Sequence, residues 1–270
     1  MANALSTGDS VAAAAVFASL FTLLTFANIF RLFQRRAWFC VPFTIGGIME
    51  TTGYISRALG SSNPTSTALK IVQVLCILLA PVLFAATIYM TLGRVVRATD
   101  GETYSLLRST WITKIFVSGD IVCFVTQAIG AGVIAAGGTA SLGGDIVLAG
   151  LVMQIVVFGF FVCVGVRFHL RLRRQPTAQS ETFRWERHMV AMYIMSAAIT
   201  SRNIYRVVEY CMGADGYIMR HEWTLYVFDA AMMVFVLSVS MRCYSLFKES
   251  AGSGKIMHEI AMEVYTRFSA

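Results

Sequence analysis

The sequence predicts an all-α membrane protein with seven transmembrane helices, and two observations support this. Of 270 residues, 57% are hydrophobic and only 14% are charged, whereas in a soluble domain about a quarter of the residues are charged. The apolar residues gather in seven runs, each long enough to cross about 30 Å of hydrocarbon as a helix. A chain this apolar cannot bury its surface in one water-soluble core. We therefore expect a multi-pass integral protein of the plasma membrane or an endomembrane.

The predicted spans follow one another with short connections. They are residues 11–33, 38–59, 69–96, 111–136, 146–172, 188–210 and 223–247. The first run is too long for a signal-peptide core and lacks a basic segment before it, so we expect it to be retained. The third and fifth runs exceed the required length and should tilt or protrude. Pro81 within the third run frees a backbone carbonyl and could kink the helix.

The chain divides into a transmembrane domain, residues 1–247, and a tail, residues 248–270. In the tail, the stretch KIMHEIAMEVYTRF places apolar residues along one helical stripe. A short helix lying on the membrane surface would use such a stripe, and a frayed tail is the alternative.

The basic residues predict the orientation. Seventeen of the 22 lie in the connections after spans one, three and five and in the tail. The opposite connections SSNPTSTA and GGTASLGGD contain no Lys or Arg. By the positive-inside rule, the tail is cytoplasmic and the N-terminus is outside or lumenal. The net charge of +7 therefore describes a basic inner rim facing anionic lipid, and it does not indicate a nucleic-acid partner.

Three of the predicted spans repeat one polar pattern in their outer halves, with charged or tyrosyl residues at positions i, i+4 and i+7. Such residues share one helix face. In chain order, the candidate ligand-binding residues are Glu50, Tyr54 and Arg57 in span two, Gln73 in span three, Asp120 and Gln127 in span four, Gln154 in span five, Arg202, Arg206 and Glu209 in span six, and Glu222, Tyr226 and Asp229 in span seven or just before it. We expect Asp120 nearer the middle of the membrane and the others at one outer level. Intramembrane ionisable groups usually mark a ligand pathway, although charged pairs can also serve only to lock the packing.

These side chains suit an amphipathic molecule whose tail stays in lipid. The acids would pair with an ammonium group, and the arginines with a phosphate or carboxylate. A metal site is not expected, because the four histidines, His169, His188, His221 and His258, are too scattered to converge. The six cysteines show none of the paired spacings of a metal site or a disulfide framework. We expect no cofactor.

Four stretches carry a resemblance to a known family. They are METTGYISRALG in span two, QVLCILLAPVLFAATIYMTLGRVV in span three, FVSGDIVCFVTQAIGAG in span four and RNIYRVVEYCMGADGYIMRHEWTLYVFDA across spans six and seven. Together they resemble the fungal RTA-like family, also called the lipid-translocating exporter family. That resemblance implies a seven-helix membrane protein connected with lipid-drug resistance, release of sphingoid long-chain bases or, in one branch, porphyrin uptake. The first span and the tail carry no such signal.

The sequence therefore favours a protein that binds and translocates or exports an amphipathic lipid-like molecule, with membrane lipids as its surroundings. No phosphate-binding G-x-x-x-x-G-K-S/T motif occurs, so transport would be facilitated, ion-coupled or dependent on a partner, and the proton is a natural coupling ion. The alternative is an intramembrane acid–base enzyme of the cyclase or isomerase type, with Asp120 or Asp229 as the acid. A seven-helix receptor is disfavoured, because span seven lacks a lysine for retinal and has no N-P-x-x-Y end. No catalytic residue is assigned.

Overall fold

The computed structural model describes residues 2–35, 38–62, 67–177, 179–180, 185–212, 224 and 226–241. These residues contain seven long helices and no strand: α1 (Ala2–Arg35), α2 (Val41–Ser62), α3 (Thr67–Ala98), α4 (Ser109–Ala135), α5 (Ala140–Arg174), α7 (Trp185–Met212) and a final helix, Tyr226–Met241. Two short 3₁₀ turns, η1 (Trp38–Cys40) and η2 (Glu102–Tyr104), lie in the connections. Each predicted span coincides with one long helix. Glu222 and the predicted tail lie outside the described residues.

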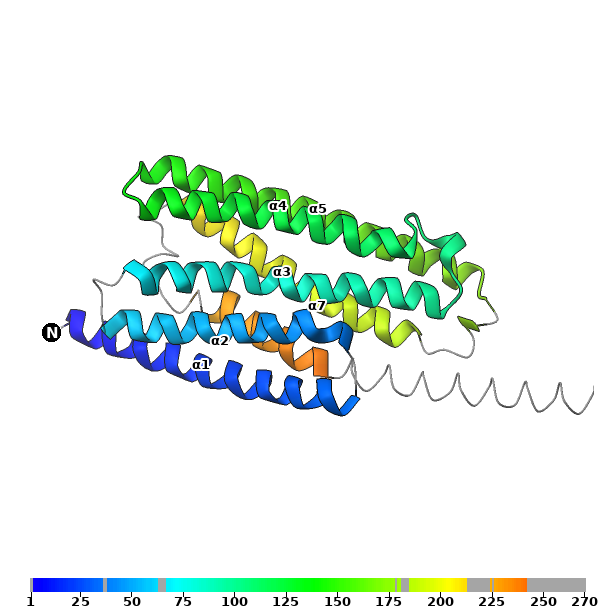
Figure 1. Ribbon diagram of the computed structural model, residues 1–270, viewed down its shortest axis with the longest axis horizontal. Helices are drawn as coiled ribbons and strands as arrows, with labels where there is room; N and C mark the ends of the chain where they lie inside the picture. The colour runs from blue at the N-terminus through cyan, green and yellow to red at the C-terminus, as the bar shows by residue number, and fades with distance from the viewer. Residues whose placement is uncertain are drawn as a thin grey trace, which may run out of the picture.

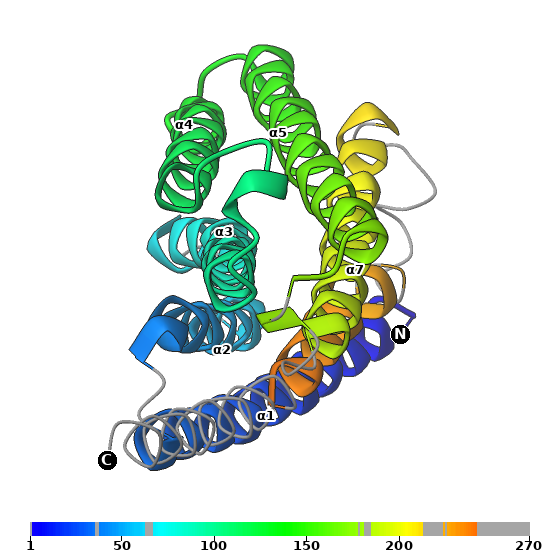
Figure 2. The same ribbon diagram turned by 90° about the vertical axis from the view of Figure 1, so that its right-hand side faces the viewer.

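Consecutive helices run antiparallel and lie side by side along the long axis of the molecule (Figure 1). Viewed along that axis, they surround a common interior, with α7 facing α3 (Figure 2). The final helix packs against α1: Arg31 Nη1 donates to the Met241 carbonyl at 2.7 Å, and the Ser240 hydroxyl donates to Asn28 Oδ1 at 3.1 Å. The first and last described helices therefore close the bundle.

The distribution of side chains is inverted relative to a soluble protein. Leu23 and Phe26 on α1 are 67% and 68% exposed, and Val156 on α5 is 65% exposed, whereas Arg202 and Asp229 are each 1% exposed. An apolar outer surface with charged groups buried inside is what a lipid environment stabilises, because charged groups there must face the protein. The protein is thus an all-α, multi-pass integral membrane protein, as the sequence predicted.

The described helices differ in how long and how apolar they are. Within the described residues, α1, α3, α4 and α5 are long and apolar enough to cross a membrane by length and composition, and the final helix is apolar but shorter. The helices α2 and α7 carry the charges of the candidate site. The two helices that are less apolar, α2 and α7, are therefore those that carry Glu50, Arg202 and Arg206.

Close packing of α4 on α5 depends on small residues. A Cβ added at Gly130 would lie 2.7 Å from the Gly143 carbonyl oxygen, so the two backbones approach as only glycine permits. Their connection turns at Gly137, whose φ of 78° lies in the left-handed region that glycine adopts without strain.

Candidate functional site

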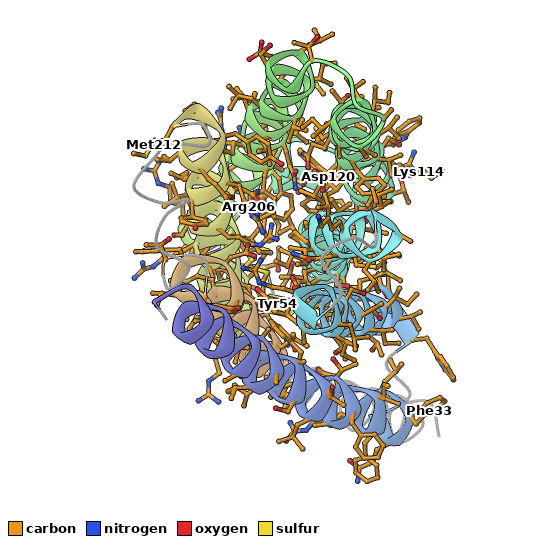
Figure 3. All side chains as sticks on the ribbon, turned by 90° about the vertical axis from the view of Figure 1, so that its left-hand side faces the viewer. Phe33, Tyr54, Lys114, Asp120, Arg206 and Met212 are labelled. Atoms are coloured by element: carbon orange, nitrogen blue, oxygen red, sulfur yellow. The ribbon has the colours of Figure 1, made fainter. Side chains whose placement is uncertain are left out.

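A cluster of buried charges lies among α2, α7 and the final helix. Glu50, Arg202 and Asp229 are each 1% exposed and Tyr54 is fully buried. Figure 3 shows Tyr54 and Arg206 reaching into the interior from opposite sides of the bundle. The cluster occupies the second halves of α2 and α7 and the start of the final helix, in the half of the molecule where α1 begins (Figure 1). The three repeats predicted from sequence thus contribute to one site.

Asp229 is the centre of this cluster. Its Oδ1 lies 2.6 Å from Arg202 Nε, and its Oδ2 accepts a hydrogen bond from Arg206 Nη2 at 2.7 Å. Arg206 Nε also donates to Oδ1 at 3.3 Å, and the Tyr54 hydroxyl donates to Oδ2 at 3.4 Å. Both carboxylate oxygens are therefore fully used, which is the condition under which a buried charge is tolerated.

The backbone that presents Asp229 is unusual. Residues Tyr226–Ala230 form a single π-helical turn, η3, before the final helix continues as an α-helix. Such one-turn π-segments are rare and recur at functional sites, because the wider turn redirects a side chain without breaking the helix. Here it presents Asp229 toward the two arginines of α7.

Pro81 explains the second contact of Arg202. A proline has no N–H, so the carbonyl four residues earlier, that of Ile77, loses its helical donor. Arg202 Nη2 donates to that carbonyl at 2.8 Å. One guanidinium thus joins α7 to the final helix through Asp229 and to α3 through the freed carbonyl. Since α3 remains one continuous helix from Thr67 to Ala98, the proline supplies an acceptor for the arginine.

A less buried set of polar groups surrounds the centre. Glu209 accepts a hydrogen bond from Arg206 Nη1 at 3.0 Å, one turn along α7. Arg57 Nε donates to the Tyr226 hydroxyl at 3.3 Å, and its guanidinium lies 5.5 Å from the centre of that ring. The ring of Tyr226 also stacks on Phe17 of α1, with ring centroids 5.5 Å apart and nearly parallel planes.

Glu50 differs from the other acids of the cluster. Both carboxylate oxygens are buried, and neither has a hydrogen-bond partner among the described residues. The charges that act on it are those of Arg202, Asp229 and Arg206. Glu50 therefore faces the ion-paired centre without being hydrogen-bonded to it among the described residues.

Apolar packing closes the bundle on the far side of this cluster. Two turns from Glu50 along α2, Phe43 packs on Phe84 of α3, with ring centroids 4.5 Å apart. Met195, two turns before Arg202 on α7, and Met233, one turn beyond Asp229, are buried in the same core. These four side chains thus form an apolar layer on one side of the polar cluster.

Three of the remaining predicted residues, Asp120, Gln127 and Gln154, belong to two pairs outside this cluster. The Tyr89 hydroxyl donates to Asp120 Oδ2 at 2.7 Å, within an aromatic group that includes Phe116 and Phe161. Figure 3 places Asp120 on the α4 side of the interior, away from Tyr54. Both pairs have buried members and join neighbouring helices, but Asp120 Oδ1 has no hydrogen-bond partner among the described residues.

The second pair joins α4 to α5. Gln127 Nε2 donates to Gln154 Oε1 at 2.8 Å, and both side chains are buried. Gln73, the predicted residue of α3, is half-buried. Within the described part of the chain, none of these three residues has a hydrogen bond or ion pair with Asp229, Arg202 or Arg206.

Sequence reasoning missed several contributors. The Ile77 carbonyl could have been found by counting four residues back from Pro81, but its arginine partner could not. Tyr89 and the aromatic residues of α1 lie in apolar runs with no distinguishing spacing. Among the described residues, no group of three His, Cys, Asp or Glu side chains is placed to hold a metal ion.

The fold and site define a class, that of polytopic helical membrane proteins with a buried, charge-paired cluster in one half of the bundle. Residues 43–248 match the family model described as RTA1 like protein. The chain therefore belongs to the RTA1-like family.

Named relatives are yeast proteins. Protoporphyrin uptake protein 1 of Saccharomyces cerevisiae is 39% identical over 198 residues, which cover 73% of this chain and 65% of the relative. Protein RTA1 of the same species is 34% identical over 207 residues, covering 76% of this chain and 65% of the relative. The sphingoid long-chain base transporter RSB1 of S. cerevisiae is 28% identical over 249 residues, covering 78% and 65%. The chain thus spans about two thirds of the length of these relatives. No solved structure matches it.

Proposed function

We propose that this protein binds the headgroup of an amphipathic, lipid-like molecule in the polar cluster and transfers the molecule across or out of the membrane. The observation that carries the proposal is the cluster itself: buried groups of both charge signs lie in one half of a bundle whose outer surface is apolar. A ligand with a charged headgroup and an apolar body would bind there with its headgroup among the charges and its body in lipid.

The relatives support this class of ligand. A protoporphyrin carries carboxylates on a large apolar ring, and a sphingoid base carries an amino group on a hydrocarbon chain. Proteins named for each are similar to this chain over most of its length. Within the cluster, Asp229 pairs with both Arg202 and Arg206, and these three residues would form a fixed frame. The headgroup would contact the residues around that frame: Glu50, Arg57, Glu209 and Tyr226.

Transport by reconstituted protein tests the proposal. Purified protein in liposomes is given a fluorescent sphingoid base or a fluorescent lysolipid, and movement between leaflets is followed by quenching from outside. We expect wild type to accelerate the movement of at least one probe, and Glu50→Gln to slow it. The matched control is Asp145→Asn, since Asp145 is an exposed acid near the start of α5. Absence of acceleration for charged amphiphiles of both signs would refute the proposal.

An acid–base enzyme acting on a lipophilic substrate is the second candidate. It is favoured by one observation: Asp120 is fully buried and its Oδ1 has no hydrogen-bond partner among the described residues, as an intramembrane acid would require. Mass spectrometry of the recovered probe separates the two. Transport returns the probe intact, whereas a new mass formed by wild type and lost in Asp120→Asn would establish the enzyme.

A further inference from the structure

Glu50 lacks the partners that its neighbours have. Asp229 accepts hydrogen bonds from Arg206 and Tyr54 and forms an ion pair with Arg202, and Glu209 accepts a hydrogen bond from Arg206. Glu50 is as deeply buried as Asp229, yet neither of its oxygens is hydrogen-bonded within the described chain. A carboxylate held in this way is among the most costly groups to bury, and either a proton or a bound cation at Glu50 would remove that cost.

The charge balance of the bonded centre defines that occupant. The two arginines, Arg202 and Arg206, are matched by the two acids bonded to them, Asp229 and Glu209. An ionised Glu50 adds one negative charge to these four groups, and one monovalent cation bound at its carboxylate would offset that charge. Arg57, the further arginine of the cluster, donates to Tyr226 instead.

Among the described residues, the cations that face Glu50 are already paired with other acids. On α7 it faces Arg202 and Arg206, which are committed to Asp229 and Glu209, and the final helix presents Asp229 itself. From its own helix comes Tyr54, which donates to Asp229, and α3 contributes the Cys76 thiol. The arginine nearest along α2, Arg57, lies two turns further and bonds Tyr226.

We propose that Glu50 is a single-cation exchange site, which holds a proton in the empty protein and releases it when the ammonium group of a long-chain amine binds. The proton leaves the carboxyl group for water as one ammonium ion takes its place, so the charge of the cluster is unchanged. Exchange of this kind would couple movement of a cationic lipid to a proton moving in the opposite direction. The inference rests on the proposed function, since it names the coupling at the same site.

Proton release during binding tests the exchange. Purified protein in weakly buffered detergent, containing a pH indicator, is titrated with a long-chain primary amine or with the alcohol of the same chain length. The titration is repeated at pH values between about 6 and about 8, where a primary amine is already protonated and brings in no base. We expect about one proton released per amine bound over part of this range, and none on binding the alcohol.

Three variants make the result specific to Glu50. In Glu50→Gln we expect release to disappear and amine affinity to fall about tenfold or more, because a charge-assisted contact is lost. Glu50→Asp should still release a proton, and Asp145→Asn should behave as wild type. Thermal unfolding of each variant establishes that it is folded.

Different results would refute the proton exchange at Glu50 and the proposed binding of an amphipathic molecule. If the amine binds wild type without proton release at every pH, or if release persists in Glu50→Gln, the exchange is refuted while binding stands. If neither the amine nor an anionic amphiphile binds wild type, the proposed function is refuted, and the exchange with it.

Discussion

Removal of the Asp229 charge is the change that should most strongly weaken the fold. Asp229→Asn keeps the size of the side chain but leaves Arg202 and Arg206 without their shared counter-charge. Arg202 is 1% exposed and Arg206 12% exposed, so water cannot replace the carboxylate. Glu50→Gln is the matched comparison, since it makes the same chemical change at an equally buried acid with no hydrogen bonds to lose.

The expected loss in the free energy of unfolding follows from the contacts of Asp229 with the two arginines. At an effective dielectric of about 20, unit charges about 2.7 Å apart attract by roughly 6 kcal/mol before desolvation is counted. Desolvation offsets much of this, and removing one partner of a buried pair typically costs about 3–5 kcal/mol because the other charge is left unpaired. We expect Asp229→Asn to lose free energy of unfolding in that range. Glu50→Gln should change it by no more than about 1 kcal/mol, the scale of one hydrogen bond.

Unfolding of purified protein in mixed micelles, followed by tryptophan fluorescence, measures both variants against wild type. Yield of monodisperse protein is a second readout, because a loss of this size lowers the amount that folds. Equal stability of Asp229→Asn and Glu50→Gln would refute the division of the cluster into a bonded frame and an available acid. A large loss in Glu50→Gln alone would reverse the two roles.

Two further predictions concern packing and orientation. Gly130→Ala should destabilise the protein by about 1–3 kcal/mol in the same unfolding assay, because its Cβ would meet the backbone of α5 at 2.7 Å; Gly132→Ala, with open space at that position, should be neutral or slightly stabilising. A cysteine at exposed Thr103 should react with a membrane-impermeant thiol reagent only from the cytoplasm, and one at exposed Thr139 only from outside. Labelling of both from one side would contradict the predicted topology.

Much of the fold follows from the order of residues alone. Each apolar run is longer than the membrane is thick, and backbone polar groups in lipid must be satisfied within the segment, so each run forms a helix. The seven predicted spans accordingly correspond to the seven long helices of the described chain. Their neighbours in space are mostly their neighbours in sequence, because short connections force antiparallel packing.

The membership of the polar cluster was only partly predictable. Spacing placed Glu50 and Tyr54 on one face of α2, and Arg202 and Arg206 on one face of α7, since helical periodicity is a local property. The same reasoning could not tell that Asp120 pairs with Tyr89, because that pairing depends on how α4 is rotated against α3.

The sequence by itself determined a helical membrane protein, the segments that cross, and the charges that must face inward, because hydrophobicity and helical period act along the chain. Only the tertiary structure decided which acid is bonded and which is available. Asp229 and Glu50 are both single acids in apolar helices, and nothing in their spacing separates them. A π-helical turn directs Asp229 toward Arg202 and Arg206, and Arg202 also donates to the carbonyl that Pro81 leaves without a helical donor. Glu50 faces the same arginines, but no described residue donates a hydrogen bond to it. Such roles depend on distances across helices, which no local pattern encodes.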